Sequence, residues 1–200
     1  MSAIVKGPDG KPRCGWCGIT HEFFDYHDKE WGYPVDDDFR LFEKICLESF
    51  QSGLSWRTIL AKRENFRNAF HHFDFNKVAQ FKKREIDRLL KDEGIVRHRG
   101  KIEATINNAA RAKELVKEEG SLAHYFWRYE SAPPATPQTV STSQESVALS
   151  KDLKKRGWKF VGPTTVYAFM QAMGLVNDHS KECVIHKKVE QARKKFRPPR

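Results

Sequence analysis

Two pairs of cysteine and histidine residues lie near opposite ends of this chain. Cys14 and His27 lie near the start, whereas His179 and Cys183 lie near the end, at a spacing that would place both side chains on one face of a helix. Two thiolates and two imidazoles form a donor set that binds zinc tetrahedrally. A shared metal would join the N-terminal and C-terminal segments in space. The spacing alone is equally compatible with four unrelated residues.

Composition limits the classes of protein that this chain can belong to. The 200 residues are 39% hydrophobic, which is enough for one core or for two small lobes that share one. Four cysteines without an apolar N-terminal segment favour a reducing compartment over a disulfide framework. No apolar run approaches the roughly 20 residues of a membrane span. We therefore expect a soluble, cytoplasmic protein without a membrane partner.

The positive charge is unevenly distributed. The formal net charge is +10, and residues 187–200 contain seven basic residues against Glu190 as the single acid. We expect this basic tail to be solvated and disordered. The smaller excess in the rest of the chain permits a nucleic-acid partner without requiring one.

Apolar residues recur at helical spacing through most of the chain, and strand patterns are nearly absent. We expect a flexible extension over 1–12 and an all-α domain over 13–186. Gly94 is expected to end a short helix in the left-handed conformation. Residues 131–143 contain three prolines and many Ser/Thr residues, which predicts a loop.

Residues 149–174 are typical of two helices joined by a tight hairpin. A basic helix should end at Gly157, and Pro163 suits the first position of the following helix. The free amides at that helix start would form an anion site. The pattern resembles the helix-hairpin-helix, which grips one DNA strand through its phosphates; an ordinary helical hairpin is the alternative. Basic residues around the corner, Lys159 among them, favour the DNA-binding reading.

A further group of residues suits a planar, electron-poor base. Glu48 is expected at the end of one helix and Trp56 at the start of the next, while Trp16 and Tyr26 lie beside the N-terminal metal-ligand candidates. Aromatic faces stack on a base, and a carboxylate accepts a hydrogen bond from an exocyclic amino group and favours a cationic ring. Taken singly, Trp16, Tyr26 and Trp56 are better explained as core residues and Glu48 as a solvated helix end.

Together these stretches resemble the DNA-3-methyladenine glycosylase I (Tag) family of the helix-hairpin-helix DNA glycosylase superfamily. The resemblance extends from about Arg13 to Cys183. The matching stretches are Arg13 to Trp16, Tyr26 to Gly32, Glu48 to Trp56, Gly94 to Lys101, Lys155 to Thr164 and Gly174 to His179.

The resemblance implies a helix-hairpin-helix glycosylase fold of two helical lobes, joined by a structural zinc site. The zinc ligands would be Cys14, His27, His179 and Cys183, and the lesion pocket would be formed by Trp16, Tyr26, Glu48 and Trp56. DNA would be contacted by Gln51, Gly53 and Leu54 and by Lys159, Gly162 and Thr164 of the hairpin.

The implied activity is that of a monomeric DNA repair enzyme acting on alkylated double-stranded DNA. It would flip out 3-methyladenine and hydrolyse the N-glycosidic bond, leaving an abasic site. An N3-alkylated purine is cationic and already a good leaving group, so recognition by Glu48 would be the main task. No lysine is placed as a Schiff-base nucleophile, which predicts a monofunctional enzyme without lyase activity. Asp178 is expected to act as a cap or to support the metal site.

Two residues depart from the family pattern. Phe50 replaces a polar residue and is expected to pack the pocket floor or to alter DNA probing. Cys17 forms a Cys-x-x-Cys with Cys14 and is a competing zinc-ligand candidate. Two other functions remain open from the residues alone, a zinc-stabilised DNA-binding module without catalysis and a zinc-dependent hydrolase with three protein ligands.

Overall fold

Helix α2, Asp38–Gln51, lies at the centre of the molecule. Asp37 caps its first turn by accepting a hydrogen bond from the backbone amide of Arg40. Apolar residues cover most of its circumference, so that it packs against α3, α7, α8 and α10. A helix buried on several faces needs such an all-round apolar surface. Helix α2 therefore fixes Glu48, in its last turn, inside the protein.

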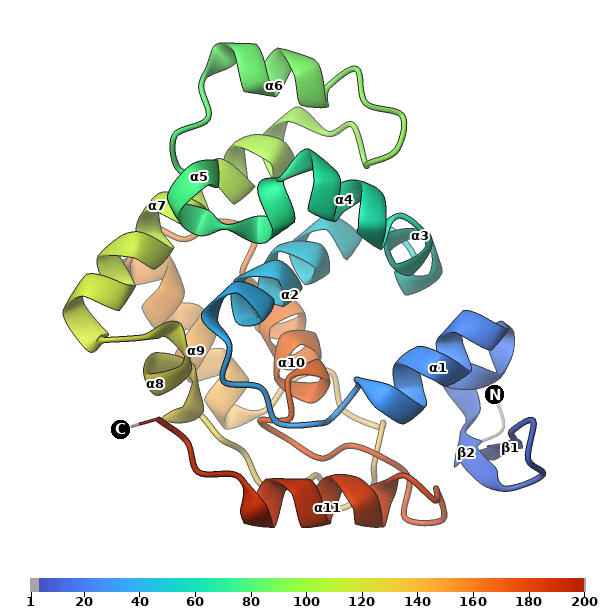
Figure 1. The fold of residues 1–200 in the computed structure, drawn as a ribbon. Helices are drawn as coiled ribbons and strands as arrows, with labels where there is room; N and C mark the ends of the chain where they lie inside the picture. Colours follow the sequence, from blue (N-terminus) through green and yellow to red (C-terminus); the bar gives the residue numbers. More distant parts are fainter. Residues whose placement is uncertain (1–3, 200) are drawn as a thin grey trace.

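The structure is a computed structural model that describes residues 4–199 (Figure 1). It is mostly helical, as the sequence predicts. The N-terminal elements are β1 (Ile4–Lys6), β2 (Pro12–Cys14), η1 (Gly15–Ile19) and α1 (His21–Lys29). The elements after α2 are α3 (Trp56–Ala61), α4 (Arg63–Ala69), η2 (His71–Phe73), α5 (Phe75–Val78), α6 (Lys83–Leu89), α7 (Arg99–Glu119), α8 (Leu122–Trp127), α9 (Gln144–Lys155), α10 (Pro163–Ala172) and α11 (His186–Lys195).

Residues 4–14 form a β-hairpin in place of the expected loose extension. Ile4 pairs with Cys14 in an antiparallel register. Arg13 is buried and donates hydrogen bonds to the carboxylates of Asp9 and Asp28, at 2.5 Å and 2.9 Å. The hairpin is therefore ordered by tertiary contacts of a charged side chain, which periodicity does not reveal.

Helix α9 and helix α10 form the expected helical hairpin, although α9 begins at Gln144 and not near Leu149. Gly157, at φ +82°, ends α9 in a Schellman motif: the amide of Trp158 donates to the Leu153 carbonyl and that of Gly157 to Lys154. Pro163 occupies the first turn of α10, as predicted. The expected helix end at Gly94 is wrong, because α6 ends at Leu89 and Gly94 lies in a turn without a positive φ.

The basic tail differs from the expected disordered segment, because helix α11 occupies most of it. Val189 is buried, and Arg193 donates to the Gly174 carbonyl and to Glu130. Asn177 donates to Glu190 at 2.7 Å. One apolar position and a few directed polar contacts thus hold a strongly basic helix against the domain (Figure 1).

Within residues 4–199, no helix has the length and apolar character needed to cross a membrane. The division into two lobes and the monomeric state remain predictions.

Candidate functional site

The four predicted metal ligands meet at one buried point. The ligand atoms of Cys14, His27, His179 and Cys183 all lie within 4.8 Å of one another. The Cys14 Sγ–His179 Nδ1 and Cys183 Sγ–His27 Nε2 distances are both 3.6 Å. Tetrahedral zinc, with bonds of about 2.3 Å to sulfur and 2.0 Å to nitrogen, would separate such atoms by about 3.5 Å. The donor set and its spacing therefore fit a zinc ion.

The ring nitrogens that point away from the cluster, here called the outer nitrogens, make hydrogen bonds that orient both imidazoles for metal binding. His27 Nδ1 lies 2.7 Å from the carboxylate of Asp28, and His179 Nε2 lies 3.1 Å from the Trp31 carbonyl. Each outer nitrogen faces an acceptor, so it carries the proton and leaves the inner nitrogen free to bind a cation. Asp28 is itself held by Arg13.

The cysteines also support a cation site. A hydrogen bond from Cys14 lowers the pKa of Cys183 well below its usual 9.0, and the same contact raises the pKa of Cys14. The thiolate, which is the metal-binding form, is thereby favoured at Cys183. Cys17 is not part of the cluster, because its Sγ donates to the Cys14 carbonyl at 3.0 Å. Its role as a competing ligand is not supported.

The expectation that His179 and Cys183 share a helix face is wrong. Residues 175–185 form turns and irregular backbone before α11 begins. The backbone amides of Ser180 and Ile185 donate to Cys14 Sγ and Cys183 Sγ, both at 3.4 Å. Hydrogen bonds from backbone amides of this irregular segment, and not a helix, therefore hold His179 and Cys183 next to Cys14 and His27.

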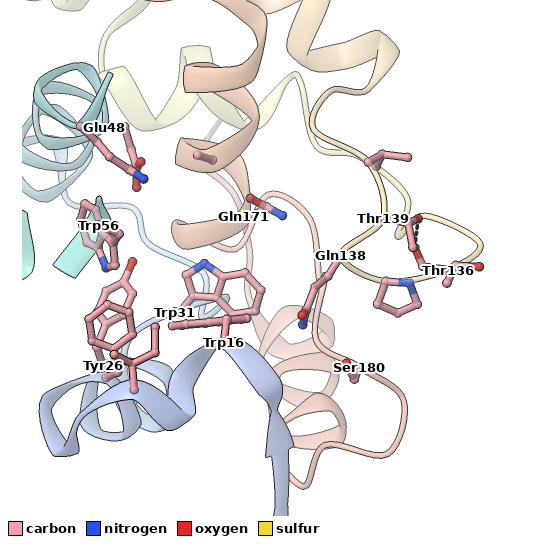
Figure 2. Close-up of a pocket in the computed structure, with 16 residues that line it drawn as sticks. Trp16, Tyr26, Trp31, Glu48, Trp56, Thr136, Gln138, Thr139, Gln171 and Ser180 are labelled. Atoms are coloured by element: carbon pink, nitrogen blue, oxygen red, sulfur yellow. Dashed lines mark hydrogen bonds between the residues drawn. The ribbon is translucent and has the colours of Figure 1, made fainter. Parts of the chain in front are cut away.

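A cavity of about 640 Å³ lies beside this cluster (Figure 2). All four predicted pocket residues line it, together with Trp31, which the sequence analysis did not single out. Trp31 lies between the pocket and the metal cluster, with its ring 4.6 Å from that of His179. Trp31 follows Tyr26 by five residues in the same motif, and this position could have identified it as a pocket residue. The cavity lining thus includes Trp16, Tyr26, Trp31, Glu48 and Trp56.

The aromatic rings form one continuous wall. The Trp16 and Trp31 ring centroids are 5.1 Å apart, and those of Tyr26 and Trp56 are 5.4 Å apart. Helix α1 supplies Tyr26, the 3-10 turn η1 supplies Trp16 and helix α3 supplies Trp56. Three helical elements and the turn that carries Trp31 therefore build the wall. Its rings are inclined to one another, by 71° for Trp16 and Trp31 and by 41° for Tyr26 and Trp56, and they offer polarisable faces and edges to an aromatic ligand.

Glu48 is the one carboxylate among the residues that line the cavity, and it is 6% exposed. Its Oε1 forms an ion pair with Lys44 Nζ at 2.8 Å, one turn earlier on α2. Lys44 also donates to Tyr26 Oη at 2.6 Å and lies 3.5 Å from the Trp56 ring centroid. Lys44 was not among the predicted site residues, although its i, i+4 spacing from Glu48 on α2 was a visible signal.

The loop 131–143 forms the opposite wall of the cavity (Figure 2). The backbone amide of Gln138 donates to Asp178 Oδ1 at 2.8 Å, and Gln171 Nε2 donates to Asp178 Oδ2 at 2.6 Å. Asp178 is fully buried and is absent from the cavity lining. It holds two pocket residues in place, so the geometry supports a cap and not a catalytic acid. The contribution of this loop was missed because its composition predicts only irregular structure.

The expected DNA-facing loop is exposed at the end of α2. Gln51 lines the cavity, Gly53 adopts φ +78°, and Leu54 is 44% exposed. Buried Lys101 donates to the carbonyls of Phe50 and Ser52, at 2.8 Å and 2.5 Å. This cation satisfies the free carbonyls at the end of α2 and fixes the loop that follows.

The connection between α9 and α10 is held by side chains of other helices. Asn108 of α7 donates to the Lys159 carbonyl at 2.9 Å and accepts from the Lys159 amide at 2.8 Å. Ser49 of α2 donates to the Phe160 carbonyl at 2.9 Å. The Lys159 and Thr164 side chains remain exposed, whereas Arg156 is engaged by acids, including Asp152 at 2.9 Å.

A smaller groove of about 300 Å³ connects this region with the DNA-facing loop. It is lined by Glu48, Gln51 and the 52–54 loop on one side and by Thr164, Thr165 and Ala168 of α10 on the other. Gly162, the N-cap of α10, makes no side-chain cap bond. The first amides of a helix without a side-chain cap are available to an anion.

Phe50 does not pack the pocket floor. It is completely buried, and its ring lies 4.7 Å from that of Phe66 and 5.9 Å from that of Phe70. It is also absent from the cavity lining. This departure from the family pattern is a change in the core.

The chain is similar to known methyladenine glycosylases over most of its length. The family model described as methyladenine glycosylase matches residues 16–186. DNA-3-methyladenine glycosylase 1 of Escherichia coli is 48% identical over 177 residues, which cover 86% of this chain and 95% of that protein.

Solved structures of such enzymes have the same fold. The structure describing 3-methyladenine recognition by 3-methyladenine DNA glycosylase I from Staphylococcus aureus aligns with a TM-score of 0.83 and 37% identity, covering 86% of this chain and 95% of that chain. A variant of 3-methyladenine DNA glycosylase I in complex with 3-methyladenine aligns with a TM-score of 0.82 and 36% identity, covering 86% and 96%. This chain therefore belongs to the methyladenine glycosylase family.

Proposed function

We propose that this enzyme removes 3-methyladenine from alkylated double-stranded DNA by hydrolysing its N-glycosidic bond, which leaves an abasic site. The observation that carries the proposal is the aromatic cavity with Glu48 as its acceptor, in a chain of the methyladenine glycosylase family. The base stacks on the wall of tryptophan and tyrosine rings. Glu48 accepts a hydrogen bond from the exocyclic amino group.

The substrate base must leave the DNA stack to reach this cavity. Unstacking costs a few kcal/mol and is easiest at a damaged base. We infer that the 51–54 loop approaches the gap left by the flipped nucleotide, because Leu54 is exposed beside the groove that leads to Glu48. The helix-hairpin-helix of α9 and α10 holds the strand, with Gly162 and Thr164 at the amides of α10 and Lys159 as a phosphate contact.

The reaction needs little help at the leaving group. The alkylated base is cationic, so breaking the bond releases a neutral base, and water completes the reaction at the sugar. A lyase step would need a free amine at the site. The two buried lysines on α2 and α7 are engaged, Lys44 with Glu48 and Lys101 with backbone carbonyls. The engagement of both amines supports a monofunctional hydrolase.

We infer that a zinc ion is held by the Cys14–His27–His179–Cys183 cluster and has a structural role. Four protein ligands leave no position for water, unlike a catalytic zinc site. The ion would join β2 and α1 to the segment before α11, and with them the wall that carries Trp16, Tyr26 and Trp31. This ligand count also disfavours a zinc-dependent hydrolase.

Release of 3-methyladenine from methylated duplex DNA tests the proposal. The wild-type protein should liberate free 3-methyladenine and leave abasic sites that alkali cleaves, while unmethylated DNA of the same sequence stays intact. Borohydride should trap no covalent complex, since no Schiff base forms. Binding of DNA without release of any base would instead support a zinc-stabilised binding module.

A further inference from the structure

The ammonium group of Lys44 lies behind the wall of the base pocket and touches three of its residues. Lys44 is 5% exposed and does not line the cavity. Its Nζ lies 2.8 Å from Glu48 Oε1, 2.6 Å from Tyr26 Oη and 3.5 Å from the Trp56 ring centroid. Glu48, Tyr26 and Trp56 therefore all contact the same cation.

This contact determines the hydrogen-bonding roles of its neighbours. An ammonium group only donates, so Tyr26 Oη accepts from Lys44 and its own proton is free to be donated elsewhere. Glu48 Oε1 is engaged by the ion pair, so the carboxylate reads a ligand with its remaining acceptor capacity. Lys44 thus orients two groups that face the base without touching the base itself.

The other acidic side chains near Lys44 and Glu48 are paired with arginines of their own. Glu30 of α1 is paired with Arg63 at 2.7 Å, and Glu43 of α2 is paired with Arg67 at 2.8 Å. Desolvation outweighs the opposing effect of the Glu48 carboxylate and lowers the pKa of Lys44 below its usual value. Separating a buried pair is costly, because the remaining charge stays uncompensated. Lys44 and Glu48 together therefore present almost no net charge to the pocket.

We propose that Lys44 is a positioning residue that sets the charge preference of the pocket, neutralising Glu48 so that the neutral leaving base is favoured over the cationic base of the substrate. The inference rests on the proposed glycosylase function and deepens it. A lone buried carboxylate would bind the cationic base most tightly before the reaction and lose that attraction as the bond breaks. The pair removes most of this ground-state stabilisation.

During the reaction, the positive charge moves from the base to the sugar. When the N-glycosidic bond breaks, its electron pair moves to the base, which becomes neutral, and the sugar carries the positive charge. Water then adds to the sugar and loses a proton. Lys44 offsets the attraction of Glu48 for the cationic base in the substrate, so little attraction is lost as the base becomes neutral on the way to the transition state. Only such differential interactions accelerate the chemical step.

Two free bases separate charge preference from general damage to the pocket. 3-Methyladenine represents the neutral leaving base, and 3,9-dimethyladeninium is a fixed cation with a methyl group where the sugar was attached. Their dissociation constants are measured by tryptophan fluorescence quenching. In Lys44→Met, the ratio of the two constants should shift at least tenfold toward the cation. Lys44→Gln should do the same, because it keeps donor hydrogens and removes the charge.

Conservative and remote variants provide the controls. Lys44→Arg keeps the charge and should retain the wild-type ratio. Lys83→Met removes a lysine from an exposed i, i+4 pair with Asp87 on α6 and should change neither constant. On methylated DNA, Lys44→Met and Lys44→Gln should lower both kcat and KM. Loss of packing alone would raise KM or weaken both free bases equally.

An unchanged ratio of the two constants in Lys44→Gln would overturn the inference, whether both ligands bind as in the wild type or are weakened equally. If Lys44→Met does not fold, Lys44→Gln carries the test, with cooperative unfolding as the check. A wild-type protein that releases no 3-methyladenine contradicts the proposed function. A wild-type protein that releases it, while the variants keep the wild-type ratio, contradicts this inference alone.

Discussion

Asn108 is the residue whose replacement most directly tests how the DNA-binding hairpin is held. Its side chain is 1% exposed and makes two reciprocal hydrogen bonds with the Lys159 backbone. We expect Asn108→Ala to remove both bonds and to leave the amide and carbonyl of Lys159 without a protein partner. Exposed Lys159 would then lose its fixed position relative to α10.

The expected loss of stability follows from these contacts. Each bond contributes about 0.5–1.5 kcal/mol, and an unsatisfied buried partner adds a desolvation cost of about 1–3 kcal/mol. Because water can reach part of the Lys159 backbone, we expect Asn108→Ala to lower the free energy of unfolding by about 2–3 kcal/mol. Asn107→Ala is the matched control, since it loses an exposed bond to the Gly157 carbonyl and a bond to Asn108 Oδ1 but leaves both bonds between Asn108 and Lys159 in place. These two losses together are worth about 1–2 kcal/mol.

Urea unfolding of both variants, followed by circular dichroism, measures the difference. Duplex DNA binding should also weaken in Asn108→Ala and remain close to wild type in Asn107→Ala. Equal losses of stability in the two variants would refute the reasoning, because the two buried bonds of Asn108 to Lys159 would then contribute no more than the contacts of Asn107.

Three further predictions concern the metal, the DNA and the pH dependence of stability. Cys14→Ala should lose zinc and unfold at lower urea concentration, because binding energy here is folding energy; metal analysis checks this, and Cys17→Ala should keep its zinc. Lys159→Ala should weaken binding across DNA sequences and reduce the salt slope by roughly one unit, whereas a loss confined to one sequence would contradict a phosphate contact. Burial raises the pKa of Asp152, but hydrogen bonds from Tyr125 and Arg156 outweigh it and keep the pKa below the usual 3.8. A depressed pKa stabilises the fold above the unfolded value, so the stability difference between wild type and Asp152→Asn should be full at neutral pH and disappear as the pH falls below about 4.

The sequence predicted the groups whose chemistry is explicit in their residue type. The metal ligands could be paired because thiols and imidazoles are few and bind the same ion. The pocket residues could be grouped because stacking needs aromatic rings and recognition needs an acceptor. The helical hairpin was predicted because glycine and proline occupy the positions where the backbone requires them, as Gly157 does at φ +82°.

Features that depend on distant contacts were not predictable in the same way. Residues 4–12 carry no strand periodicity, and the hairpin is held by Arg13 with Asp9 and Asp28. The role of loop 131–143 in the pocket depends on Asp178, some 40 residues away. Helix α11 looked like a disordered tail because only Val189 gives it a fully buried apolar position.

Lys44 and Phe50 show why the role of a residue on α2 could not be predicted from the local sequence pattern. Both lie on α2 within one turn of Glu48, but one pairs with it and the other points into the core. The side that each residue faces depends on how α1, α3 and α4 pack around α2. That packing is a property of the whole domain and not of the local pattern.

Excision of 3-methyladenine by Glu48→Gln tests the central claim most directly. The substitution keeps the shape and one acceptor but removes the charge, and loss of a charge-assisted hydrogen bond costs about 1.5–3 kcal/mol. We expect release of 3-methyladenine from methylated duplex DNA to fall by more than tenfold, with zinc content and nonspecific DNA binding retained. Release at the wild-type rate would contradict the account, because Glu48 would then be only a structural partner of Lys44.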